Sequence, residues 1–144
     1  MTDFEYPHLK RIALKALAQR AGPAAGGEAI ATAVQRAYDD LAQAAVPLIG
    51  QVGINALTGR MLYLVHPTYP WLAVPHDPGE WTGPLAPIIA GLKQQTPAIA
   101  MDAAGAMFAT LAGLIATLIG EPLATQLLQA AWPDVSSDAR TREK

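Results

Sequence analysis

The most constraining feature of this chain is a long stretch with almost no charge, residues 98–120, AIAMDAAGAMFATLAGLIATLIG. Its one charged side chain is Asp102, and none follows from Ala103 to Gly120. On a helix, the large side chains of this stretch fall on one broad face and the small ones on the other. A helix that is apolar on all sides is either buried in a core or embedded in a membrane. The stretch therefore predicts a central helix over about 98–119.

The small-residue face of this helix has a spacing that lets another helix backbone approach closely. We predict a helix–helix interface there, and its candidate residues are Gly105, Ala109, Gly113 and Ala116. The uncharged run just reaches the lower limit for a membrane span. No belt of Trp or Tyr flanks it closely, and no cluster of Lys or Arg marks a cytoplasmic side. We therefore favour a helix buried in a bundle, and a span over 98–120 is the alternative.

The rest of the chain is also helical in pattern. Apolar residues at helical spacing predict further helices over about 8–20, 28–46, 48–65, 84–93 and 121–132. Pro47 is expected to end or kink the helix before it. Thr96-Pro97 has the residue types of an N-cap and a first helical position. The sequence predicts an all-α protein: a single compact bundle of five or six helices around the helix at 98–119.

The domain organisation follows from length and from the distribution of charge. The 144 residues are enough for one helical domain, with an ordered core over about 7–133 and a polar tail over 134–144. Charged residues are only 15% of the chain and apolar residues 51%. Such a charge-poor chain offers little polar surface, and exposed apolar patches usually mark interfaces. We expect a homo-oligomer, a protein partner or a membrane contact.

Several classes of function are disfavoured by residue type. The net charge is −2 and there is no basic run, so we expect no nucleic-acid partner. Cysteine is absent, and the only serines lie in the tail, which argues against nucleophilic hydrolysis. No glycine-rich phosphate loop is present, and we predict no cofactor. The N-terminal residues lack the apolar segment of a secretory signal, so we expect a cytoplasmic protein.

Residues 66–84, HPTYPWLAVPHDPGEWTGP, differ from the rest of the chain because prolines and aromatic residues are concentrated there. Regular structure is implausible at this proline density, and long loops are usually functional or disordered. We expect an ordered loop pinned by Trp71 and Leu72. Its aromatic and acidic residues form a candidate site for a ligand or partner: His66, Tyr69, Trp71, His76, Asp77, Glu80 and Trp81. Their spacing matches no known metal-ligand motif, so we predict no metal, and capping of the bundle end is the structural alternative.

Three isolated charges lie in apolar surroundings and are candidate buried charges: Arg60, Asp102 and Glu121. Arg60 either extends along the surface with its charge in water or pairs with one of the two carboxylates inside an interface. Asp102 is expected to lie in the N-terminal turn of its helix, where the helix dipole stabilises a carboxylate.

The sequence favours a non-catalytic function. We expect a small bacterial-type helical protein that self-associates or binds a protein partner, as a regulator, adaptor or assembly subunit. The charge-poor surface and the small-residue helix face carry this expectation. The first alternative is a membrane-associated protein with helix 98–120 in the bilayer. The second is a small-ligand-binding protein or an enzyme that uses the 66–84 loop.

Overall fold

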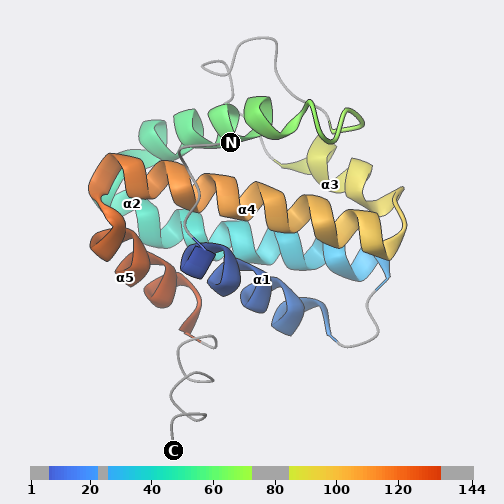
Figure 1. The fold of residues 1–144 in the computed structure, drawn as a ribbon, viewed down its shortest axis with the longest axis horizontal. Helices are drawn as coiled ribbons and strands as arrows, with labels where there is room; N and C mark the ends of the chain where they lie inside the picture. Colours follow the sequence, from blue (N-terminus) through green and yellow to red (C-terminus); the bar gives the residue numbers. More distant parts are fainter. Residues whose placement is uncertain (1–6, 23–25, 73–84, 134–144) are drawn as a thin grey trace, which may run out of the picture.

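The computed structural model describes residues 7–22, 26–72 and 85–133. These ranges contain no strand and five helices, α1 (Pro7–Ala21), α2 (Gly27–Val65), α3 (Ala86–Lys93), α4 (Pro97–Ile119) and α5 (Glu121–Ala131). Helices α1, α2 and α5 all pack against α4, and α3 packs against α2 (Figure 1). The predicted all-α bundle is confirmed, and the apolar helix lies at its centre.

Helix α4 begins and ends where the sequence predicts. The side chain of Thr96 accepts a hydrogen bond of 3.4 Å from the backbone N–H of Ile99, and Pro97 follows as the first helical residue. Gly120 ends the helix with a φ of 95°, a conformation that L side chains rarely adopt. Between these ends most of the large face is buried, including Met107, Leu111 and Ile115.

Helix α2 is two helical arms joined by a sharp break. Gly50 has φ 80° and ψ 163°, far from helical values, although the residues on both sides are helical. The first arm (residues 27–49) and the second arm (residues 51–65) run in opposite directions across the bundle (Figure 1). The sequence predicts an end or a kink at Pro47, but Pro47 stays inside the helix. The break falls at Gly50 because its backbone conformation is essentially restricted to glycine.

A pair of hydroxyl groups, one buried and one half-buried, joins the two arms of α2. The side chain of Thr58 is fully buried and donates a hydrogen bond of 2.8 Å to the backbone carbonyl of Ile54. Because the single hydroxyl proton of Thr58 is engaged in this bond, the hydroxyl of Tyr38 is the donor to the Thr58 oxygen, also at 2.8 Å. Burial raises the pKa of Tyr38 above its ordinary value. The two arms are held by polar as well as apolar contacts.

The first and last helices are each fastened to the first arm of α2. Arg20 at the end of α1 forms an ion pair of 3.0 Å with Asp40. Trp132, just after α5, is fully buried and donates from its ring nitrogen to the carbonyl of Ala37 at 3.2 Å. The same ring packs edge-on against Phe108 of α4. These contacts close the bundle around α4.

Candidate functional site

The small-residue face of α4 is covered by the same chain. Gly105, Gly113 and Ala116 are buried, and Ala109 is half-buried. A Cβ atom on Gly105 would lie 2.5 Å from Cδ2 of Leu14, so this glycine is where α1 packs against α4. The close helix approach expected from the spacing therefore occurs within one molecule. At Gly105 the neighbouring helix is α1 of the same chain.

The three candidate buried charges are exposed in the structure, which corrects that expectation. Arg60, Asp102 and Glu121 all lie on the surface of the bundle. Asp102 also lies beyond the first turn of α4, because the helix already begins at Pro97. Its partner is the hydroxyl of Tyr69, which donates to its carboxylate, rather than the end of the helix. The apolar sequence around Asp102 predicted burial, but this part of α4 is exposed, as Ala98, Ile99 and Asp102 show.

The candidate loop is described only in its first part. His76, Asp77, Glu80 and Trp81 lie outside the described residues. Leu72 is buried as expected, and Trp71 is half-buried, with its ring beside the backbone of Gly91 in α3. Nδ1 of His66 is buried and has no hydrogen-bond partner among the residues that the structure describes. No group of three or more His, Cys, Asp or Glu in the described ranges could hold a metal ion.

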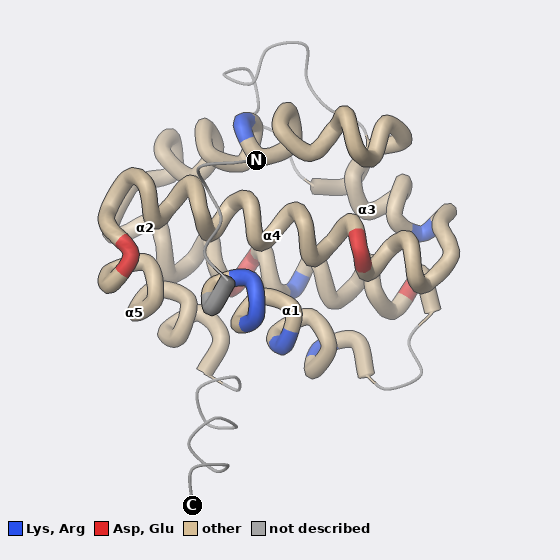
Figure 2. Tube along the Cα trace, in the orientation of Figure 1, with Lys and Arg blue, Asp and Glu red and all other residues tan. Residues whose placement is uncertain are grey.

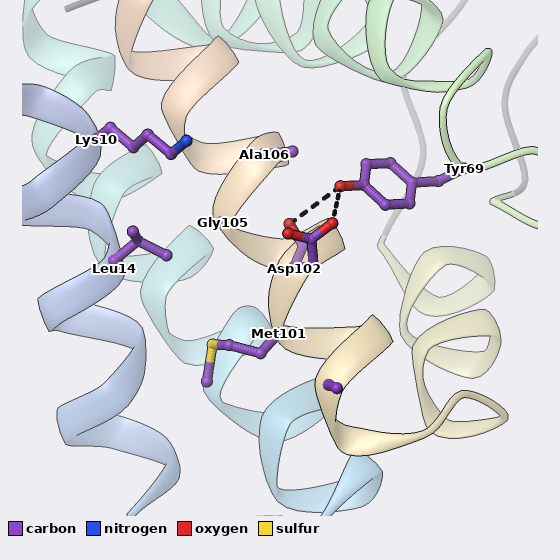
Figure 3. A pocket seen from close by; sticks show the side chains of 8 residues that line it. Lys10, Leu14, Tyr69, Met101, Asp102, Gly105 and Ala106 are labelled. Carbon is purple, nitrogen blue, oxygen red and sulfur yellow. Dashed lines mark hydrogen bonds between the residues drawn. The ribbon is translucent and has the colours of Figure 1, made fainter. Parts of the chain in front are cut away.

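A half-open pocket of about 480 Å³ lies between α1, α4 and Tyr69 (Figure 3). Its walls combine apolar and charged side chains, and they consist of Lys10, Leu14, Tyr69, Ala98, Met101, Asp102, Gly105 and Ala106. The hydroxyl of Tyr69 donates to the carboxylate of Asp102, and also lies 3.4 Å from the Asp102 backbone carbonyl. Desolvation and the neighbouring Asp102 carboxylate raise the pKa of Tyr69 to about 12. The phenol therefore stays a hydrogen-bond donor at neutral pH.

A second surface, which we name the apolar end, surrounds the two helix breaks at Gly50 and Gly120. The turn between the two arms of α2 and the turn from α4 to α5 lie at the same end of the long axis of the molecule (Figure 1). Large apolar side chains flank them, with exposed fractions of 49% for Leu48, 83% for Val52, 58% for Leu118 and 39% for Leu123. The side chains of residues 42–59 carry no charge, and Glu121 is the only charged residue from 103 to 133. Charge is correspondingly sparse around this end in Figure 2.

Most residues of these two surfaces do not stand out in the sequence. Leu14 falls outside the apolar stripe of its helix, and this displaced leucine was a signal that α1 presents a second contact. Tyr69 and Asp102 were each singled out, but their contact joins residues 33 apart. At the apolar end, the available signal was a leucine or valine within three residues of each helix-breaking glycine.

Comparisons of this chain with protein-family models, with curated proteins and with solved structures find no match.

Proposed function

We propose that this chain is a non-catalytic helical protein that self-associates through its apolar end. The observation that carries the proposal is the exposure of Val52 and Leu118, together with Leu48 and Leu123, at a surface where Glu121 is the neighbouring charge. Exposed apolar groups that lie together usually mark an interface. Most homo-oligomers are two-fold dimers in which the same patch faces itself, so an apolar, charge-poor patch is self-complementary.

The size of the apolar end favours a weak dimer. Fully burying a leucine or valine side chain stabilises by about 1.5–3 kcal/mol, so covering these partly exposed side chains contributes about 1 kcal/mol each. A two-fold contact covers the four side chains twice, which gives about 8 kcal/mol in total before the cost of association. The cost of association, about 4 kcal/mol or more, is subtracted from this sum, so the affinity that these four side chains supply is about millimolar or weaker. We therefore expect a dimer that dissociates on dilution.

The test is the molar mass by light scattering on size exclusion, measured over a range of protein concentrations. Val52→Glu places an anion near the N-terminus of the second arm, and Leu118→Lys places a cation near the C-terminus of α4. Both charges agree with the local helix dipole, so neither variant weakens the monomer fold. We expect both variants to stay monomeric at concentrations where the wild type is a dimer.

A matched control adds the same charge elsewhere. Ala90→Glu changes an exposed residue of α3 outside the apolar end, and we expect it to dimerise like the wild type. A wild type whose molar mass stays that of a monomer up to several millimolar would refute self-association. A dimer that survives both Val52→Glu and Leu118→Lys would place the interface on another surface.

Membrane association is the second candidate function, because α2 and α4 are each long and apolar enough to cross a membrane. In α4, 61% of the apolar window is buried inside the bundle. The break at Gly50 divides α2, and the second arm of 15 residues is shorter than the about 20 that a span needs. Sedimentation with membranes after expression without detergent tests this candidate. Recovery of the protein only from the membrane pellet would replace the self-association proposal.

A further inference from the structure

The pocket between α1 and α4 carries opposite charges on opposite walls. Lys10 extends from α1 toward α4, and the carboxylate of Asp102 lies on the α4 side beside Tyr69 (Figure 3). Neither side chain forms an ion pair with another described residue. The ion pair between Arg20 and Asp40 lies elsewhere in the bundle. An ammonium and a carboxylate that face the same pocket without ionic partners can each pair with an oppositely charged group of a bound molecule.

Between these two charges the pocket is apolar. Leu14 lies on the α1 side, and Met101 and Ala106 lie on the α4 side. Gly105 leaves the space into which the end of Leu14 extends, since a Cβ there would lie 2.5 Å from the leucine Cδ2. The volume of about 480 Å³ is within the range of about 300–1,000 Å³ that is typical of small-molecule sites.

Tyr69 holds the Asp102 carboxylate in place for a ligand. Its hydroxyl donates to Oδ2, and Oδ1 of the same carboxylate accepts no hydrogen bond from the described residues. A carboxylate can accept about four hydrogen bonds, so it keeps the capacity to receive an ammonium group. Because the phenol keeps its proton at neutral pH, Tyr69 adds no second negative charge beside the Asp102 carboxylate.

We propose that this pocket binds a small zwitterion, a molecule with a carboxylate at one end, an ammonium at the other and an apolar body between them, as in a short unblocked peptide. The ligand carboxylate pairs with Lys10, and its ammonium pairs with Asp102. The apolar body covers Met101 and Leu14. A simple anion would face the Asp102 carboxylate and a simple cation would face Lys10, so a molecule with both charges satisfies the pocket best.

The experiment is a titration of the full chain, followed by amide chemical shifts in NMR and by calorimetry at low ionic strength. The probes are Leu-Leu and Leu-Ala-Leu with free termini, so that two separations of the charges are covered. Each is compared with its N-acetyl and its C-amide form. Lys10 and Asp102 are both exposed, and ion pairs at exposed sites are weak, so we expect removal of either terminal charge to weaken binding about 2- to 5-fold.

Two variants assign the ends of the ligand. In Lys10→Gln the free peptide and its C-amide should bind equally, because the partner of the carboxylate is gone. In Asp102→Asn the free peptide and its N-acetyl form should bind equally. Arg11→Gln removes the neighbouring exposed charge of α1 and should leave the affinity unchanged.

Three results would overturn the proposal. The first is that neither free peptide shifts the amide signals of Met101 and Ala106 at millimolar concentration. The second is that blocked and free peptides bind the wild type equally. The third is that Arg11→Gln and Lys10→Gln weaken binding equally. Thermal unfolding of each variant separates a loss of binding from a loss of fold. The oligomeric state of the protein does not enter these readouts, so failure here and failure of the self-association proposal are distinguishable.

Discussion

Replacement of Gly50 by alanine tests the break in α2, the feature that gives the bundle its shape. Gly50 has φ 80° and ψ 163°, a region that residues with a side chain almost never occupy. An added Cβ would have no atom within 4 Å, so no collision contributes to the effect. The whole consequence of Gly50→Ala therefore arises from the backbone.

Two terms set the magnitude. Holding a non-glycine residue in such a conformation costs about 1–3 kcal/mol. Alanine also restricts the unfolded chain, which stabilises the folded state by about 0.4–1 kcal/mol. The net expectation is a loss of about 1–2 kcal/mol in the free energy of unfolding. For a domain of this length, that corresponds to a decrease in Tm of about 3–6 °C.

The assay is urea unfolding followed by far-ultraviolet circular dichroism, with Gly91→Ala as the matched control. Gly91 lies inside α3, and its added Cβ would make ordinary contact with Trp71 at 3.5 Å. Alanine favours helix over glycine by up to about 1 kcal/mol, so the control should be neutral or more stable. If Gly50→Ala were as stable as Gly91→Ala, the positive φ at Gly50 and the break that it makes would be refuted.

Two further predictions concern hydroxyl groups. Thr58→Val should destabilise by about 1–3 kcal/mol in urea unfolding, since it leaves the half-buried hydroxyl of Tyr38 without its partner. Tyr38→Phe should cost less, because Thr58 keeps its bond to Ile54, and an equal loss in the two variants would contradict this. The pKa of Tyr69 is raised from 10.0 to about 12, so its contribution to stability is complete below pH 10 and is lost as the pH rises to about 12. In an ultraviolet titration, one tyrosine that ionises at high pH should disappear in Tyr69→Phe. Asp102→Asn should lower the pKa of Tyr69, and an unchanged pKa in this variant would contradict the hydrogen bond.

The central helix could be predicted closely from local signals. The pair Thr96-Pro97 and the glycine at 120 fix its ends through backbone chemistry that depends only on neighbouring residues. Its burial followed from the absence of charge, since an all-apolar helix has no face to present to water. The close approach at Gly105 was also predictable, because small residues one turn apart permit it on any helix.

The break in α2 and the pocket depend on information that the local sequence does not carry. Pro47 is the stronger helix breaker by propensity, yet its backbone stays helical and the break falls at Gly50. The pairing of Tyr69 with Asp102 needs the relative placement of two segments that are distant in the chain. The partner of the small-residue face was ambiguous for the same reason, since α1 and a second molecule satisfy the same spacing.

The hairpin of α2 also has a consequence for the order of folding. The Tyr38–Thr58 contact joins residues 20 apart, whereas the bond from Trp132 to Ala37 joins residues 95 apart. Loop-closure entropy grows with the logarithm of length, so the shorter closure costs about 1.4 kcal/mol less. During synthesis, both arms of α2 leave the ribosome before α4 and α5. The inner face of the hairpin is then formed early and stays uncovered until the central helix arrives, so the nascent chain is most prone to aggregate at this stage.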